Sequence, residues 1–126
     1  MDKQIIPTDK APAPIGPYSQ AVMAGGTLYV SGQVPIDPAT GQVIKGDIEA
    51  EARQVMQNIG AILQAYDLNY SHMVKTTIFL KSMDDFARIN AVYGSFFEKD
   101  FPARETVEVS RLPKDVQIEI SCIAVK

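Results

Sequence analysis

Residues 48–82 read IEAEARQVMQNIGAILQAYDLNYSHMVKTTIFLKS, and the spacing of the apolar residues changes along this stretch. They first recur every three or four positions, as on one face of an α-helix. Residues 73–82 are instead a dense apolar run with β-branched members, which is typical of a strand inside a sheet. The stretch therefore predicts a helix over residues 48–66, N-capped by Asp47, followed by a central strand. The apolar helical positions are Ile48, Ala52, Val55, Met56, Ile59, Ile62, Leu63 and Tyr66.

The flanking segments complete an α+β pattern. Residues 18–24 and 27–36 are separated by a pair of glycines and predict a hairpin. A second helix is expected to begin at Ser82, and residues 104–110 and 116–121 are expected to form a closing hairpin. The resulting order β-β-α-β-α-β-β predicts one domain over residues 1–126, with a mixed sheet and two helices packed on one face. The apolar stripe of the second helix is Phe86, Ile89, Tyr93, Phe96 and Phe97.

The closing hairpin places charged residues on one face of the predicted sheet. Matching Val107 and Val109 to the apolar positions of residues 116–120 sets Thr106 across from Glu119. Arg104 then lies one diagonal step from that carboxylate. Two interpretations stay open on the spacing alone. One is a surface ion pair worth ~0–1 kcal/mol, which the spacing favours, and the other is a functional site, which the spacing does not exclude.

Several strands are apolar on both faces, although two helices cover only one. Tyr29 and Phe79 alternate with apolar neighbours and are expected on the face away from the helices. An exposed face of this kind needs cover, so we expect a homo-oligomer.

Composition narrows the classes of protein. The net charge of −3 and the pI near 5.0 give no basic footprint for nucleic acid. No run reaches the ~18 apolar residues of a membrane span, and the N-terminus does not read as a signal peptide. One cysteine, Cys122, and one histidine, His72, fall short of a metal-ligand set. We therefore expect a cytoplasmic protein without metal, cofactor, nucleic-acid partner or membrane partner.

Four segments together resemble the RidA/YjgF family of reactive-intermediate (2-imino acid) deaminases, from about residue 11 to residue 125. They are APIGPYSQA, VSGQVPIDPATG, VKTTIFLKSMDDFARINAVYGSFF and FPARETVEVSRLPKDVQIEISCIAV. The resemblance implies a chorismate-mutase-like fold and a homotrimer with sites in clefts between subunits. It also implies hydrolysis of 2-iminobutanoate and 2-iminopropanoate, or their enamine tautomers, to 2-oxo acids and ammonia.

The resemblance also implies roles for individual residues. Arg104 would clamp the substrate carboxylate, and Glu119 would orient or activate the attacking water. Many members carry Ser-Cys where this chain has Glu105-Thr106, so a thiol cannot be required here; the backbone of Thr106 could still hold the imine and the water. If Glu105 faced the cleft, it would weaken the binding of anionic substrates. The remaining substrate-binding positions of the family pattern are Tyr18, Ser31, Gly32 and Asn90.

Other interpretations stay open on the sequence. Tyr18 can be an ordinary tyrosine at the edge of the core, and Gly32 can simply relieve crowding in a strand. A regulator that binds small carboxylates without turnover would also use Arg104. An RNA-acting protein is a third class, since some relatives have been described as ribonucleases or translation inhibitors, but the acidic pI argues against it.

Overall fold

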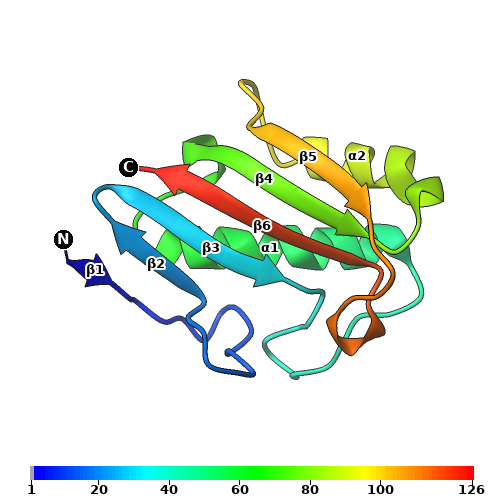
Figure 1. Cartoon of the computed structure of the whole chain (residues 1–126), viewed down its shortest axis with the longest axis horizontal. Helices are drawn as coiled ribbons and strands as arrows, with labels where there is room; N and C mark the ends of the chain where they lie inside the picture. The colour runs from blue at the N-terminus through cyan, green and yellow to red at the C-terminus, as the bar shows by residue number, and fades with distance from the viewer. Residues whose placement is uncertain (1) are drawn as a thin grey trace.

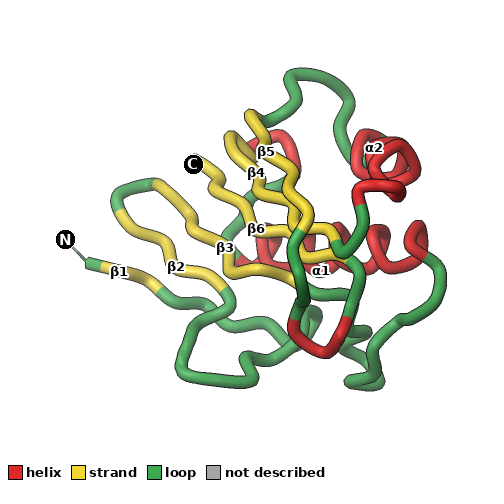
Figure 2. The backbone as a smooth tube through the Cα atoms, turned by 45° about the vertical axis from the view of Figure 1, so that its right-hand side comes forward, coloured by secondary structure: helices red, strands yellow, loops and turns green. Residues whose placement is uncertain are grey.

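A computed structural model describes residues 2–126 and has a six-stranded mixed sheet in the order β1-β2-β3-β6-β4-β5. Figures 1 and 2 show both α-helices on the same side of this sheet, so the predicted α+β class is confirmed. The strands are β1 (Lys3–Gln4), β2 (Ala21–Ala24), β3 (Thr27–Gln33), β4 (Met73–Leu80), β5 (Ala103–Glu108) and β6 (Ile118–Val125). The α-helices are α1 (Ile48–Ala65) and α2 (Phe86–Gly94), and the 3₁₀ turns are η1 (Tyr70–His72), η2 (Met83–Asp85) and η3 (Pro113–Asp115).

The predicted helix is confirmed within one residue as α1. Asp47 caps it as expected, because its side chain accepts a hydrogen bond from the Glu49 N–H at 3.0 Å. Its apolar face packs on the helix-facing side chains of β3, β4 and β6, which are fully buried. These strand residues include Leu28, Ile78, Leu80, Ile118 and Ile120.

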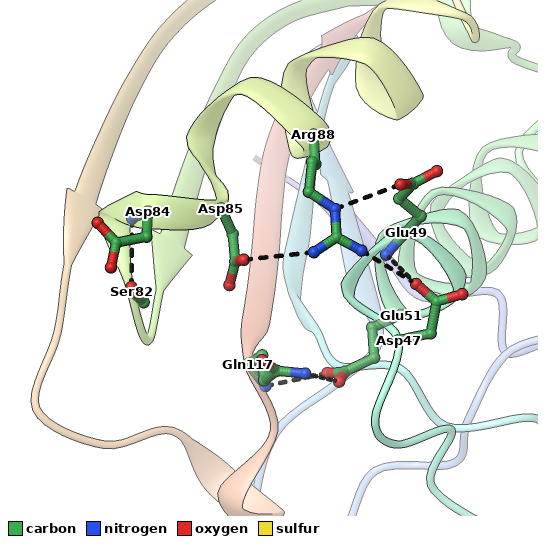
Figure 3. Close-up of polar contacts among 8 residues, drawn as sticks. All are labelled: Asp47, Glu49, Glu51, Ser82, Asp84, Asp85, Arg88 and Gln117. Atoms are coloured by element: carbon green, nitrogen blue, oxygen red, sulfur yellow. Dashed lines mark hydrogen bonds and ion pairs between the residues drawn. The ribbon is translucent and has the colours of Figure 1, made fainter.

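Polar side chains join the starts of the two helices (Figure 3). Arg88 of α2 lies 3.6 Å from the Asp47 carboxylate, 3.3 Å from that of Glu49 and 3.9 Å from that of Asp85. Glu51 is buried and accepts hydrogen bonds from the backbone and side-chain amides of Gln117 at 3.0 and 2.5 Å. These contacts hold α1, α2 and the segment before β6 together, on the helical side of the sheet.

The second helix begins later than predicted. The Ser82 side chain accepts from the Asp84 N–H at 3.2 Å and caps η2, which leads into α2 at Phe86. The helix ends at Gly94, so Phe96 and Phe97 lie beyond it, although both pack against the core.

The predicted closing hairpin is wrong. β5 pairs in parallel with β4, and β4 pairs antiparallel with β6, so β4 lies between the two expected partners. The apolar run of β4 explains the difference: a strand buried at this depth needs its backbone hydrogen bonds satisfied on both edges. Arg104 is consequently opposite Thr76, and Glu119 is opposite Phe79. Side chains alternate along a strand, so Arg104 and Glu119 lie on opposite faces of the sheet.

The sheet face away from the helices is open along much of its length. Tyr29 is 51% exposed there and Val107 42%, while Phe79 is half-buried between buried neighbours. Glu105 also faces this side, with its carboxylate 3.2 Å from Lys75 Nζ and 2.5 Å from the Thr77 hydroxyl. The prediction for Tyr29 and Phe79 is confirmed, and Glu105 lies on the opposite face of β5 from Arg104.

Candidate functional site

The residues that the sequence singles out form two separate groups. The first surrounds an open pocket of about 350 Å³, called the Glu119 pocket below. It is lined by Ile15, Tyr18, Ser31, Gly32, Val34, Pro113 and Glu119. Four of the predicted site residues therefore meet in one hollow, supplied by the N-terminal loop, β3 and β6.

An irregularity in β3 shapes the floor of the Glu119 pocket. The pairing of β3 with β6 shifts between Val30 and Gln33, so Ser31 and Gly32 depart from the regular ladder. The Ser31 hydroxyl donates to the Ser19 carbonyl at 2.6 Å, which ties the strand to the N-terminal loop. Tyr18 lies at the rim, and its hydroxyl oxygen accepts from the Ile15 N–H at 3.2 Å.

Gly32 lets the Glu119 carboxylate lie directly on the β3 backbone. A Cβ atom added to Gly32 would meet Glu119 Oε2 and would lie 2.7 Å from its Cδ. A side chain at position 32 would therefore push the carboxylate away. The glycine thus serves close packing against Glu119.

Burial changes the protonation behaviour of Glu119. The side chain is half-buried, and desolvation raises the pKa of its carboxyl above the ordinary glutamate value. A carboxylate with a raised pKa is a better proton acceptor than a free one, and it faces an open hollow.

The second group lies on the helical face of the sheet, around Arg104. The guanidinium carbon is 5.1 Å from the ring centroid of Tyr93 and 5.6 Å from that of Phe86. No carboxylate among residues 2–126 lies within salt-bridge distance of this guanidinium. Arg104 is therefore held by two aromatic rings of α2 while its charge stays uncompensated within the described chain.

Thr106 and Asn90 belong to the same side. Thr106 follows Arg104 at the next position on that face of β5, and its hydroxyl oxygen is buried without a hydrogen-bond partner in the described chain. Asn90 lies on α2 at helical spacing from both Phe86 and Tyr93, so it shares the face that covers Arg104. A buried hydroxyl without a partner is costly, which suits a position that a ligand or a second subunit completes.

The structure brings together the predicted site residues within each group but not between the groups. Tyr18, Ser31, Gly32 and Glu119 share one face, and Asn90, Arg104 and Thr106 share the other. Sequence reasoning missed Phe86 and Tyr93 as partners of Arg104. Their helical spacing indicated core positions, and only the parallel pairing of β5 with β4 brings Arg104 beneath them.

The described residues, 2–126, offer neither a metal-ligand cluster nor a membrane-spanning helix. No group of three or more His, Cys, Asp and Glu side chains there is arranged to hold a metal ion. The same range holds no helix of the length and apolar character that crossing a membrane requires.

Known proteins resemble this chain along nearly its whole length. The sequence profile of the family described as Endoribonuclease L-PSP matches residues 8–126. A RutC family protein of Pyrococcus horikoshii is 55% identical, with 98% of each chain covered. The crystal structure of the YjgF gene product of Escherichia coli is 50% identical, covers 98% of both chains and superposes with a TM-score of 0.93. The Escherichia coli TdcF structure with bound serine is 43% identical over 98% of both chains, with a TM-score of 0.94. On this evidence the chain belongs to the RidA/YjgF family.

Proposed function

We propose that this protein hydrolyses 2-imino acids, such as 2-iminobutanoate and 2-iminopropanoate, to 2-oxo acids and ammonia. The site would lie between neighbouring subunits of a homotrimer, with the Arg104 group of one subunit facing the Glu119 pocket of the next. The observation that carries the proposal is the division of the candidate residues between two faces of one sheet. Each group is incomplete alone: one offers an uncompensated guanidinium, the other an open hollow with a proton acceptor.

Arg104 would recognise the substrate carboxylate. A 2-imino acid carries a planar carboxylate next to an electrophilic C=N carbon, and the guanidinium fork matches that carboxylate in shape and charge. Glu105 does not compete for Arg104, since it points to the other face of β5 and binds Lys75 and Thr77. Within one subunit, Glu105 therefore does not lie beside Arg104.

Glu119 would manage the water and the protons. Water adds through its oxygen to the C=N carbon of the protonated imine while the Glu119 carboxylate accepts one of its protons, which leaves a hydroxyl and an amine on a tetrahedral carbon. Glu119 then returns that proton to the amine nitrogen. The C–N bond breaks and ammonia leaves as Glu119 accepts the hydroxyl proton and the C=O bond of the 2-oxo acid forms; this last proton passes from Glu119 to the ammonia or to solvent. Atoms and charge balance without a metal or a redox partner.

A homotrimer would also account for the open sheet face. Tyr29 and Val107 are exposed there although both are apolar enough to be expected in an interface. Covering that face with neighbouring subunits would bury these side chains. It would also place surfaces from two subunits close to each sheet edge.

A regulator that binds small carboxylates without turnover is the second candidate. TdcF, at 43% identity, is known with bound serine, which also carries a carboxylate. Both functions would need Arg104, but only hydrolysis would need a proton acceptor in the Glu119 pocket.

Ammonia release tests the proposal. Imines are generated in situ with an amino-acid oxidase, and ammonia is followed with and without the protein. Arg104→Ala is expected to lower kcat/KM by about 100-fold or more, because two charge-assisted hydrogen bonds of about 1.5–3 kcal/mol each are lost. Arg104→Lys is expected to recover only part of this, since a point charge cannot replace the fork.

The matched control is Arg111→Ala. Arg111 is exposed, and within residues 2–126 its only ion pair is with Asp115, at 2.7 Å, so its removal is expected to leave turnover unchanged. Wild-type turnover in a folded Arg104→Ala protein would overturn the proposal. Carboxylate binding by the wild type without ammonia release would favour the regulator.

A further inference from the structure

We propose that Tyr93 and Phe86 form an aromatic cradle that positions the Arg104 guanidinium for the incoming carboxylate, with Tyr93 fixed in turn by Thr76. The inference rests on the proposed function for its kinetic consequence. The cradle itself concerns only the contacts of Arg104. Tyr93 and Phe86 are thus positioning residues, since they act through Arg104 and not on the substrate.

The two rings contact the guanidinium from one helix. Phe86 and Tyr93 are seven residues apart on α2, which is about two turns, and their ring centroids lie 5.6 and 5.1 Å from the Arg104 guanidinium carbon. Both distances lie within the ~6 Å range of a cation–π contact. Two such contacts restrict a long side chain that would otherwise lose much rotamer freedom on binding.

Tyr93 is itself fixed from the sheet. Its hydroxyl and the Thr76 hydroxyl are 2.8 Å apart, and both residues are buried. Thr76 is directly opposite Arg104 in the β4–β5 ladder, so the anchor of the ring and the arginine belong to neighbouring strand positions. Phe97 also packs against the Tyr93 ring, at a centroid distance of 5.0 Å. The proximity of the Arg104 charge favours the ionised phenolate, yet burial is the larger effect and raises the pKa of Tyr93.

Aromatic support leaves the charge of Arg104 available. Arg88 is the contrast within this chain, because three carboxylates lie within 4.0 Å of its guanidinium nitrogens. A guanidinium held by carboxylates would have to give up an ion pair before it could bind an anion. Arg104 is held by ring faces, so within the described part of the chain its hydrogen-bond donors remain free for a carboxylate.

The cradle can be tested without any ligand. In a ¹⁵N–¹H NMR spectrum of the wild-type protein, the Arg104 Nε–H signal is expected to be shifted by the ring currents and protected from exchange. Arg104→Lys assigns the signal by its loss. Tyr93→Leu is expected to move it toward the position of a solvated arginine, while Tyr93→Phe keeps most of the shift. An Arg104 signal unchanged in Tyr93→Leu would overturn the cradle.

Kinetics then test its consequence. Tyr93→Leu is expected to raise KM for the imine by about tenfold, because Arg104 loses a partly desolvated cation–π contact and is no longer held in position for the carboxylate. Tyr93→Phe is expected to stay within about threefold of wild type, because the ring remains. Phe96→Leu is the control: it removes a ring that packs at a tilt against Tyr70, with 5.4 Å between the centroids. Within the described residues this ring makes no cation–π contact with Arg104, so KM should not change.

Folding and function are separated by two further measurements. Sizing and urea unfolding show whether Tyr93→Leu keeps the wild-type fold. If it does not, Phe86→Leu serves the same purpose at a half-buried ring. A wild-type KM in both leucine variants would overturn the positioning role even if Arg104→Ala is inactive. Absence of turnover in the wild type would defeat the proposed function, whereas the NMR result would still decide the cradle.

Discussion

At the scale of single residues, alternation along a strand decides what each side chain can do. Glu105 and Thr106 replace the Ser-Cys found in many relatives, and the two changes have separate consequences. Glu105 points to the open face, where Lys75 and Thr77 bind it and hold the pKa of its carboxyl below the usual range. Thr106 points to the Arg104 side with a buried hydroxyl that lacks a partner in the described chain.

The contact of Gly32 with Glu119 gives a prediction. Gly32→Ala is expected to displace the carboxylate, since the new Cβ would lie 2.7 Å from Glu119 Cδ, and to lower kcat/KM by about tenfold or more. Stability should change little because the half-buried side chain can swing into the pocket. Glu119→Gln provides the reference: if Gly32→Ala acts through this carboxylate, adding it to Glu119→Gln costs no further activity. A full additional loss in the double variant would contradict this explanation.

The raised pKa of Glu119 predicts the pH dependence of activity. The carboxylate form accepts the proton from water, so kcat/KM falls as the pH drops through this pKa. Burial raises the pKa, and the acidic limb should therefore lie above 4.5, the ordinary glutamate value. The limb should disappear in Glu119→Gln. A limb at or below 4.5, or one that persists in that variant, would assign the titration to another group.

At the scale of elements, the sequence predicts best those helices and strands whose apolar residues recur at a regular spacing within one continuous segment. The helix over residues 48–66, the hairpin of β2 and β3 and the interior position of β4 all follow from apolar spacing and turn residues. The strand that pairs with β5 could not be predicted in this way. The apolar pattern suggested a register between β5 and β6, but it carries no information on whether another strand, here β4, lies between them. The site shows the same division: motif resemblance finds Arg104 and Glu119, but the two faces they occupy depend on that pairing.

The helix α1 offers a test against simple propensity. Gly60 lies inside α1, where replacing a glycine by alanine ordinarily raises the free energy of unfolding by about 1 kcal/mol. A Cβ there would meet the Tyr70 hydroxyl and lie 2.7 Å from the Tyr70 Cζ. That hydroxyl donates a hydrogen bond to the Met56 carbonyl at 2.8 Å. Gly60→Ala is therefore expected to lower the free energy of unfolding by about 1–3 kcal/mol.

Urea unfolding at equal protein concentration measures this change. Gly94→Ala is the matched control, because nothing lies within 4 Å of a Cβ at that helical position. It is expected to be neutral or slightly stabilising. A stabilised Gly60→Ala protein would mean that Tyr70 moves aside without cost.

At the scale of the whole molecule, the sheet divides the candidate site. A single chain carries the Arg104 group on the helical face of its six-stranded sheet and the Glu119 pocket on the other face. A change of side-chain rotamer cannot bring the two groups together, because the sheet lies between them. Assembly is the remaining way to join them. Light scattering of a homotrimer would give a molar mass of about 41 kDa, three times that of the 13.8 kDa chain. A 13.8 kDa species at micromolar concentration that still turns over imines would contradict the shared site.

Mixed trimers test the shared site most directly. Arg104→Ala and Glu119→Gln subunits are each expected to retain only a residual rate alone, about a hundredth of the wild-type rate, since every cleft then lacks one essential group. When the two are unfolded together and refolded in equal amounts, about a quarter of the clefts should combine the intact Arg104 of one subunit with the intact Glu119 of its neighbour. Ammonia release should therefore return to about a quarter of the wild-type rate. A mixture of Arg104→Ala with the Arg104→Ala/Glu119→Gln double variant contains no intact cleft and should not rise above the residual rate. Failure of the first mixture to recover, with hybrid trimers verified by mass, would place both groups in the site of one subunit or remove one of them from catalysis.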